Sequence, residues 1–184
     1  LGDDFVDGKV VVLYSSKYGG SKKYAELISK KLNSYIFDIN NFDKSVLMKA
    51  ETIIFGAGVY AGSVNNIKMF GELAYLLQGK RFIVFTCGLT DRDDNSGITL
   101  IDNNLNKALK ELEFKYYYYM GKIDYAKLNF IDKIIMKVLV KSLSKKSEND
   151  LTKHDKLILS TYGQVLDLIN EDSIEDLIKY VRGV

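Results

Sequence analysis

Serine and glycine residues cluster directly behind an apolar run near the start of the chain. The stretch VVVLYSSKYGGS, residues 10–21, passes from β-branched residues into hydroxyls and glycines, and a helical pattern follows at once. Glycines let the backbone turn tightly and expose its amides, and the first turn of a helix favours negative charge. Lys17, Lys22 and Lys23 add positive charge. The segment therefore predicts an anion-binding loop, although an ordinary strand-to-helix turn with a serine cap has a similar composition.

Two further glycine-bearing segments also follow apolar runs: GAGVYAGS at residues 56–63 and TCGLTDRDD at residues 86–94. Ligands of open α/β sheets bind at the carboxyl ends of the strands, so the three segments are expected to form one site. A glycine-rich backbone can approach a flat ring closely, and Tyr60 can stack on that ring. Two alternatives remain open when each loop is considered alone: Tyr60 could merely cover the core, and Cys87 could be chemically inert. Together, one anion-binding loop and two loops shaped for a flat ring fit flavin mononucleotide (FMN).

In such a site the cofactor carries the chemistry, so neither a catalytic side chain nor a metal ligand is predicted. The serine hydroxyls and the amides of residues 17–20 are expected to hold the phosphate, and the backbone of residues 58–62 is expected beside the ring. The residues predicted to bind the cofactor are Ser15, Ser16, Lys17, Tyr18, Gly19, Gly20, Ser21, Gly58, Val59, Tyr60, Ala61, Gly62, Thr86, Cys87, Gly88 and Leu89.

Composition excludes several other kinds of site. The 26 basic and 24 acidic residues nearly cancel, so the net charge argues neither for nor against a nucleic-acid or membrane partner, and no nucleic-acid partner is predicted. The single cysteine excludes an internal disulfide and fits a cytoplasmic location. With His154 as the only histidine, a histidine-based triad or a structural zinc site is excluded. No apolar stretch reaches the ~20 residues of a membrane span, and the acidic N-terminus lacks the pattern of a signal peptide.

Apolar runs and amphipathic patterns alternate along the chain. Such alternation is typical of a parallel sheet covered by helices on both faces. The tyrosine run at 116–119 is expected to pack in the core on both faces of its strand. The length favours one domain over residues 1–184, with residues 1–8 as an end outside the fold. Strands are predicted at 9–14, 35–39, 80–88 and 115–121, and the segment 51–60 is predicted as a strand core that ends in a glycine-rich turn. Helices are predicted at 21–33, 65–77 (capped by Asn65), 98–112, 128–146 and 173–182 (capped by Asp172 or Ser173).

The sequence resembles the flavodoxin family at these same loops. LYSSKYGGSKKYAELIS resembles the flavodoxin phosphate loop, and IIFGAGVYAGS and FIVFTCGLTD are similar to the two loops around the flavin ring. The segment GKIDYAKLNFIDKIIMKVLVKSLS resembles the branch that includes menaquinone-dependent protoporphyrinogen dehydrogenase, with Gly121, Tyr125 and Asp132 in the matching places. The tryptophan that stacks on the ring in many flavodoxins is absent, which leaves Tyr60 or Tyr125 for that role.

The resemblance implies an α/β fold of the flavodoxin-like type, a three-layer sandwich with a five-stranded parallel sheet in the order 2-1-3-4-5. It also implies FMN as cofactor and an oxidoreductase or electron-transfer function, with a redox partner protein and a quinone or porphyrinogen-type substrate. A soluble flavodoxin-type electron carrier, and an interaction module that has lost the flavin, remain alternatives. A phosphoacceptor domain has the same strand order but needs acidic residues where this chain has Ser15–Ser16 and Phe55–Gly56.

The predicted helix 128–146 carries four lysines spaced four residues apart, from Lys133 to Lys145, beside a broad apolar face. A helix that packs on the core and exposes its lysines is the favoured interpretation. The alternative is docking onto an anionic membrane or a partner, which would place the protein at the inner face of the membrane.

Overall fold

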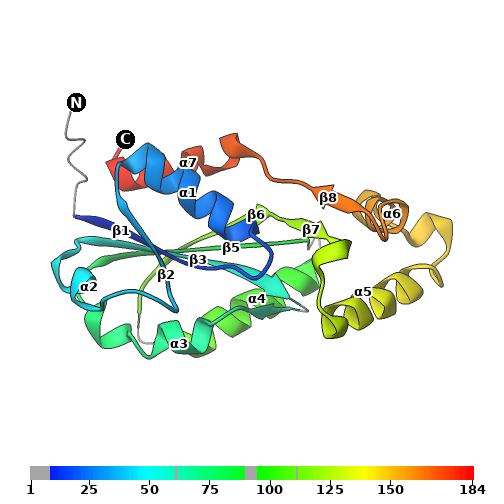
Figure 1. The fold of residues 1–184 in the computed structure, drawn as a ribbon, viewed down its shortest axis with the longest axis horizontal. Helices are drawn as coiled ribbons and strands as arrows, with labels where there is room; N and C mark the ends of the chain where they lie inside the picture. The colour runs from blue at the N-terminus through cyan, green and yellow to red at the C-terminus, as the bar shows by residue number, and fades with distance from the viewer. Residues whose placement is uncertain (1–8, 61, 90–94, 111) are drawn as a thin grey trace.

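The structure is a computed structural model that describes residues 9–60, 62–89, 95–110 and 112–184 (Figure 1). In the described chain, the main sheet is built on parallel strands in the order β2-β1-β3-β5-β6. This is the predicted order when the parallel strands are numbered along the chain, so the predicted fold class is confirmed. The strands are β1 (Val10–Ser15), β2 (Tyr35–Asp38), β3 (Thr52–Tyr60), β5 (Arg81–Gly88) and β6 (Lys115–Met120).

Helices cover both faces of the sheet (Figure 1). Successive residues of β1 point to opposite faces: Val12 packs in the same cluster as Tyr24 and Ile28 of α1, whereas Val11 and Leu13 belong to the other cluster. A strand buried on both faces needs apolar residues throughout, which explains its unbroken apolar run. On one face lie α1 (Gly20–Leu32) and α7 (Glu175–Arg182), and on the other lie α2 (Ser45–Lys49), α3 (Ile67–Gly71) and α4 (Asn95–Ala108).

The tyrosine run of β6 packs in the core as predicted. Tyr119 is buried and stacks on Tyr24 with ring centroids 4.9 Å apart. Tyr116 and Tyr118 pack against the cluster on the opposite face.

The glycine-rich end of β3 differs from the prediction. It was expected to be a turn, but the strand continues to Tyr60 and pairs antiparallel with β4 (Ser63–Val64). Gly56 lies inside the strand, and the ring of Phe85 explains why this residue is a glycine. A Cβ placed on Gly56 would lie 2.0 Å from Cζ of Phe85. Glycine in a strand interior often marks such a close approach.

Several helix boundaries also differ from the prediction. The helix expected over 65–77 begins after Asn66, which is left-handed with φ 54°, and ends at Gly71; a short 3₁₀ turn, η1 (Ala74–Leu76), follows. Asn65 is therefore not its N-cap. The final helix begins at Glu175 and is preceded by a 3₁₀ turn, η4 (Glu171–Ile174). The N-cap of this turn is Asn170, whose side chain accepts from the Asp172 amide, so neither Asp172 nor Ser173 is the cap.

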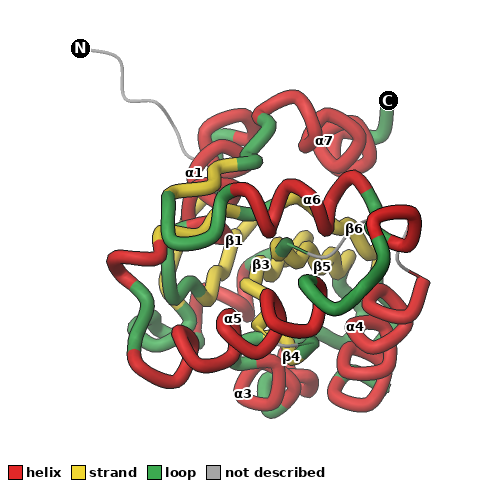
Figure 2. The backbone as a smooth tube through the Cα atoms, turned by 90° about the vertical axis from the view of Figure 1, so that its right-hand side faces the viewer, coloured by secondary structure: helices red, strands yellow, loops and turns green. Residues whose placement is uncertain are grey.

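Between β6 and η4 the chain makes an excursion over residues 121–169, beyond the carboxyl ends of the parallel strands (Figures 1 and 2). It has its own small apolar cluster around Ile123, Tyr125, Leu128 and Leu166. Sequence analysis predicted only its long helix and missed the rest. Its elements are β7 (Lys122–Asp124), η2 (Tyr125–Lys127), α5 (Phe130–Leu143), η3 (Glu148–Asp150), α6 (Lys153–Ser160) and β8 (Val165–Asp167), with β7 and β8 antiparallel.

The two ends of the excursion meet at one hydroxyl. The Tyr24 O–H of α1 donates to the Met120 carbonyl at 2.8 Å and accepts from the Asn170 amide at 3.1 Å. Within the described ranges, no helix has the length and apolar character needed to cross a membrane.

We expect Gly56→Ala to destabilise the protein by about 1–3 kcal/mol, because the added methyl overpacks the contact with Phe85. Urea unfolding measures the effect. In a Phe85→Leu background the smaller side chain leaves room, so the same substitution should cost less there; an equal cost in both backgrounds would contradict this account of Gly56.

Candidate functional site

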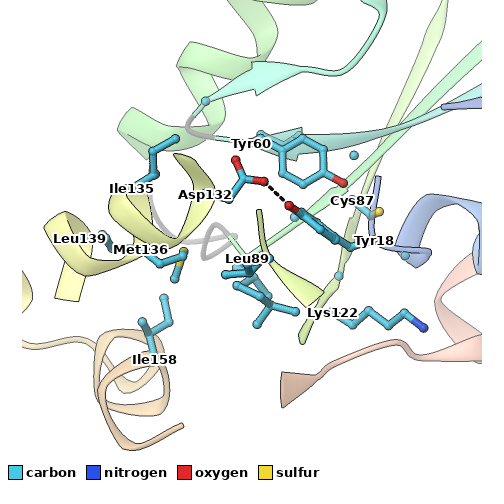
Figure 3. A pocket seen from close by; sticks show the side chains of 18 of the residues that line it. Tyr18, Tyr60, Cys87, Leu89, Lys122, Asp132, Ile135, Met136, Leu139 and Ile158 are labelled. Carbon is cyan, nitrogen blue, oxygen red and sulfur yellow. Dashed lines mark hydrogen bonds between the residues drawn. The ribbon is translucent and has the colours of Figure 1, made fainter. Parts of the chain in front are cut away.

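A cavity of about 500 Å³ opens at the carboxyl ends of the parallel strands, between their loops and the helices α5 and α6 (Figure 3). Its size is typical of small-molecule sites. Ala61 lies outside the described residues. Five predicted residues do not line the cavity: Ser15, Ser16, Lys17, Gly19 and Thr86. Ten do: Tyr18, Gly20, Ser21, Gly58, Val59, Tyr60, Gly62, Cys87, Gly88 and Leu89.

At one end of the cavity lies the start of α1. Gly19 is left-handed with φ 85°, and its amide donates to Oγ of Ser16 at 3.0 Å. The amides of residues 20–22 donate to no acceptor among the described residues, as expected for the first turn of a helix. The Lys17 amide instead donates to the Tyr60 hydroxyl at 3.3 Å. Of the amides predicted to hold the phosphate, those of Lys17 and Gly19 donate within the protein, whereas that of Gly20 is unpaired together with those of Ser21 and Lys22.

Two predicted hydroxyls hold the framework instead of facing the cavity. Ser15 is fully buried, and its Oγ accepts from the side-chain amides of Asn65 at 2.6 Å and Asn66 at 3.1 Å. Thr86 is also buried and shares a 2.6 Å hydrogen bond with the Tyr116 hydroxyl. Neither hydroxyl lines the cavity, and a direct contact of either with the cofactor stays a prediction.

Three glycines near the strand ends, Gly58, Gly88 and Gly121, line the cavity. The Gly121 amide donates to the Gly88 carbonyl at 2.7 Å, and a Cβ on Gly121 would lie 3.2 Å from the Gly88 nitrogen. Tyr60 folds back over the third glycine, Gly58. Tyr125 does not line the cavity and packs edge-on against Tyr162, so of the two tyrosines predicted to stack on the ring only Tyr60 lies in the cavity wall.

Burial governs the ionisation of two groups in the cavity wall. It raises the pKa of Tyr60 to about 12 and that of the Cys87 thiol to about 12. Both groups are therefore neutral near pH 7, and the structure gives Cys87 no thiolate character that would make it reactive.

Asp132 of α5 ties the helix to the first loop. It is only 9% exposed, lies 2.5 Å from the Lys17 ammonium, and accepts from the Tyr18 hydroxyl (Figure 3). The Asn129 amide donates to that same hydroxyl at 3.2 Å. Burial raises the pKa of Asp132, but the hydrogen bonds from Lys17 and Tyr18 outweigh it and hold that pKa below its ordinary value. Sequence analysis gave Asp132 no role in the site.

The far side of the cavity is apolar. Figure 3 places Ile135, Met136 and Leu139 of α5 and Ile158 of α6 across the cavity from Tyr18 and Cys87. The ring of His154, also on α6, contacts the Leu89 carbonyl through Nε2.

The outward face of α5 is apolar as well. Phe130, Ile131 and Val138 are 77%, 66% and 63% exposed, and the buried residues of the helix are Asp132 and Leu143. The favoured interpretation, a helix whose apolar face packs on the core, is therefore wrong.

Comparisons with known proteins agree with this architecture. The family model described as the flavodoxin domain matches residues 11–150. Among curated proteins no match to the chain was found.

Three solved structures illustrate the similarity. Oxidised flavodoxin 2 from Bacillus cereus is 20% identical, with 61% of this chain and 84% of that chain covered and a TM-score of 0.47. Two-electron reduced flavodoxin from Megasphaera elsdenii is 13% identical, with 61% and 83% covered and a TM-score of 0.45. A flavoprotein in complex with FMN from Lactobacillus acidophilus NCFM is 14% identical, with 61% and 91% covered and a TM-score of 0.43.

We expect Asp132→Asn to lower the free energy of unfolding at pH 7 by about 1 kcal/mol or less, since Lys17 is partly exposed to solvent. The folded pKa of Asp132 lies below its unfolded value, so its stabilisation is present above about pH 4 and is lost as the pH falls through the folded pKa. Urea unfolding at pH 7 and pH 3 should therefore show a smaller difference between variant and wild type at pH 3. Glu72→Gln, on an exposed side chain, serves as the control; a difference that stays constant with pH would refute the ion pair.

Proposed function

Because the chain belongs to the flavodoxin domain family, we propose that it binds FMN in this cavity and works as an FMN-dependent oxidoreductase or electron-transfer protein. The observation that carries the proposal is the set of unpaired amides at the start of α1, where Gly20 and Ser21 line a cavity that Gly58, Gly88 and Gly121 line as well. Bound FMN supplies the redox chemistry through its flavin ring, and the protein binds, orients and shields it.

The donors at the start of α1 fit the phosphate of FMN. The amides of residues 20–22 would donate to its oxygens at the positive end of the helix dipole. The Ser16 hydroxyl does not line the cavity; its oxygen accepts from the Gly19 amide and so supports the turn that presents these donors. Gly58, Gly88 and Gly121 line the cavity without side chains, so the flavin ring would meet backbone there, and Tyr60 lies in the same wall.

The apolar side of the cavity supports a finer proposal about the substrate. A carrier that passes electrons to proteins needs its ring edge open to a partner surface, whereas α5 and α6 cover this cavity with aliphatic side chains. Those side chains would keep water away and contact an apolar molecule. We therefore favour a quinone or a porphyrinogen-type substrate over the alternative, a flavodoxin-type carrier with a redox partner protein.

The outer face of α5 supports a proposal about location. At helical spacing the exposed apolar side chains lie between the cavity side of α5 and a stripe formed by Lys133, Lys137 and Lys141. A helix of this kind lies in the plane of an anionic membrane, with its apolar face in the lipid. We propose that α5 docks on the inner face of the membrane, where apolar electron acceptors dissolve.

We expect Gly20→Asp to abolish FMN binding without unfolding the protein. A Cβ at this position meets Cys87 Sγ at 3.4 Å, an ordinary contact, but the carboxylate places negative charge where the phosphate would lie. Titration of the apo-protein with FMN, followed by quenching of flavin fluorescence, measures binding, and circular dichroism checks the fold. Gly20→Asn is the uncharged control. Wild-type protein that is colourless and cannot be reconstituted with FMN would disprove the proposed function.

We expect wild-type protein to float with vesicles that contain anionic lipid, and the triple variant K133E/K137E/K141E to lose this binding. Each lysine near such a surface contributes about 1 kcal/mol, so three charge reversals should remove most of the affinity. The control variant K30E/K44E/K49E changes the same number of exposed lysines elsewhere. Equal flotation of both variants would rule out docking through α5.

A further inference from the structure

We propose that Lys122 of β7 is the residue that neutralises the FMN phosphate, so that the cofactor site is completed by the excursion 121–169. The inference rests on the proposed FMN function. It concerns a residue that sequence analysis did not predict and that lies outside the three glycine-bearing loops.

The side chain of Lys122 runs along the two glycines at the start of α1, Gly19 and Gly20. A Cβ placed on Gly19 would lie 3.5 Å from Cε and 3.7 Å from Nζ of Lys122. A Cβ placed on Gly20 would lie 3.7 Å from the Lys122 amide nitrogen. The ammonium group is therefore held against the same turn that presents the unpaired amides, and Lys122 lines the cavity (Figure 3).

The lysines that the sequence offered for this role are engaged elsewhere. Lys17 pairs with Asp132, whereas Lys22 lies 3.8 Å from Glu26 and Lys23 lies 3.8 Å from Glu171. Each of the three therefore has a carboxylate beside it.

Lys122 has no acidic partner within 4.0 Å among the residues that the structure describes. Its cross-strand neighbour on β8 is Asp167, whose carboxylate accepts instead from the Ile169 amide at 3.1 Å. Lys122 thus brings a positive charge, unmatched by any described carboxylate, to a helix end that is itself positive. A phosphate would remove this repulsion and satisfy the amides as well.

The position of Lys122 is fixed from both sides. The preceding residue, Gly121, donates from its amide to the Gly88 carbonyl at 2.7 Å and accepts from the Leu168 amide at 3.1 Å. The next residue, Ile123, is buried opposite Leu166 in the β7–β8 pair. A lysine anchored in this way loses less freedom on binding than one on a mobile loop.

The test compares two flavins that differ in the phosphate. We expect Lys122→Met to weaken FMN binding by about 10- to 100-fold, the range for a hydrogen bond to a charged group. Binding of riboflavin, which has no phosphate, should not change. Lys122→Arg should retain most of the FMN affinity, and Lys115→Met, at an exposed lysine of β6, should leave both flavins unaffected.

A second measurement needs no variant. If Lys122 contacts the phosphate, salt should weaken FMN binding to wild-type protein more than riboflavin binding, because ions screen the charge pair. Equal loss of both flavins in Lys122→Met, or no loss of either, overturns the role of Lys122 but leaves the proposed function standing. Wild-type protein that binds neither flavin overturns the proposed function, and this inference with it.

Discussion

The unsatisfied backbone amides at the start of α1 are the constraint around which the carboxyl end of the sheet is arranged. They exist because the chain leaves β1 through a left-handed turn at Gly19, which points the first turn of the helix toward the cavity. Buried polar groups must find partners, so a chain that keeps this turn open needs either water or a ligand there. The neighbouring polar groups are satisfied internally: Ser15 by two asparagines, and Lys17 by Asp132. The anion site therefore stands out against a framework whose own hydrogen bonds are made.

The pattern of apolar residues was sufficient to predict the parallel strands and their burial on both faces. The unbroken apolar run of β1 and the alternation of Tyr116–Tyr119 both describe strands covered on two faces, and the strand order followed from the resemblance to flavodoxins. The glycines of β3 predicted a turn, but the strand continues through them, and Gly56 makes room for the Phe85 ring. Elements as short as β7 and β8 span three residues each, and a period of two cannot be recognised over so short a length.

The site was predictable where it is local and not where it depends on distant segments. Gly20, Tyr60 and Gly88 each belong to a loop that is one short continuous segment of the sequence, and all three residues line the cavity. Lys122 and Asp132 reach the first loop from more than 100 residues away, and no local pattern announces such a contact. The apolar face of α5 was visible in the sequence, but an amphipathic pattern does not state what covers that face.

The hydroxyl of Tyr24 holds the two ends of the excursion 121–169 together. Because it bonds to Met120 and Asn170, the chain leaves the core and returns to it at one point, which the core itself provides. The cost of closing such a loop rises only slowly with its length, so the segment between these two residues can change in size without disturbing the sheet. Length is therefore free to vary in the middle of the segment 121–169, whereas its beginning, which carries Lys122 and Asp132 to the first loop, is fixed by those contacts.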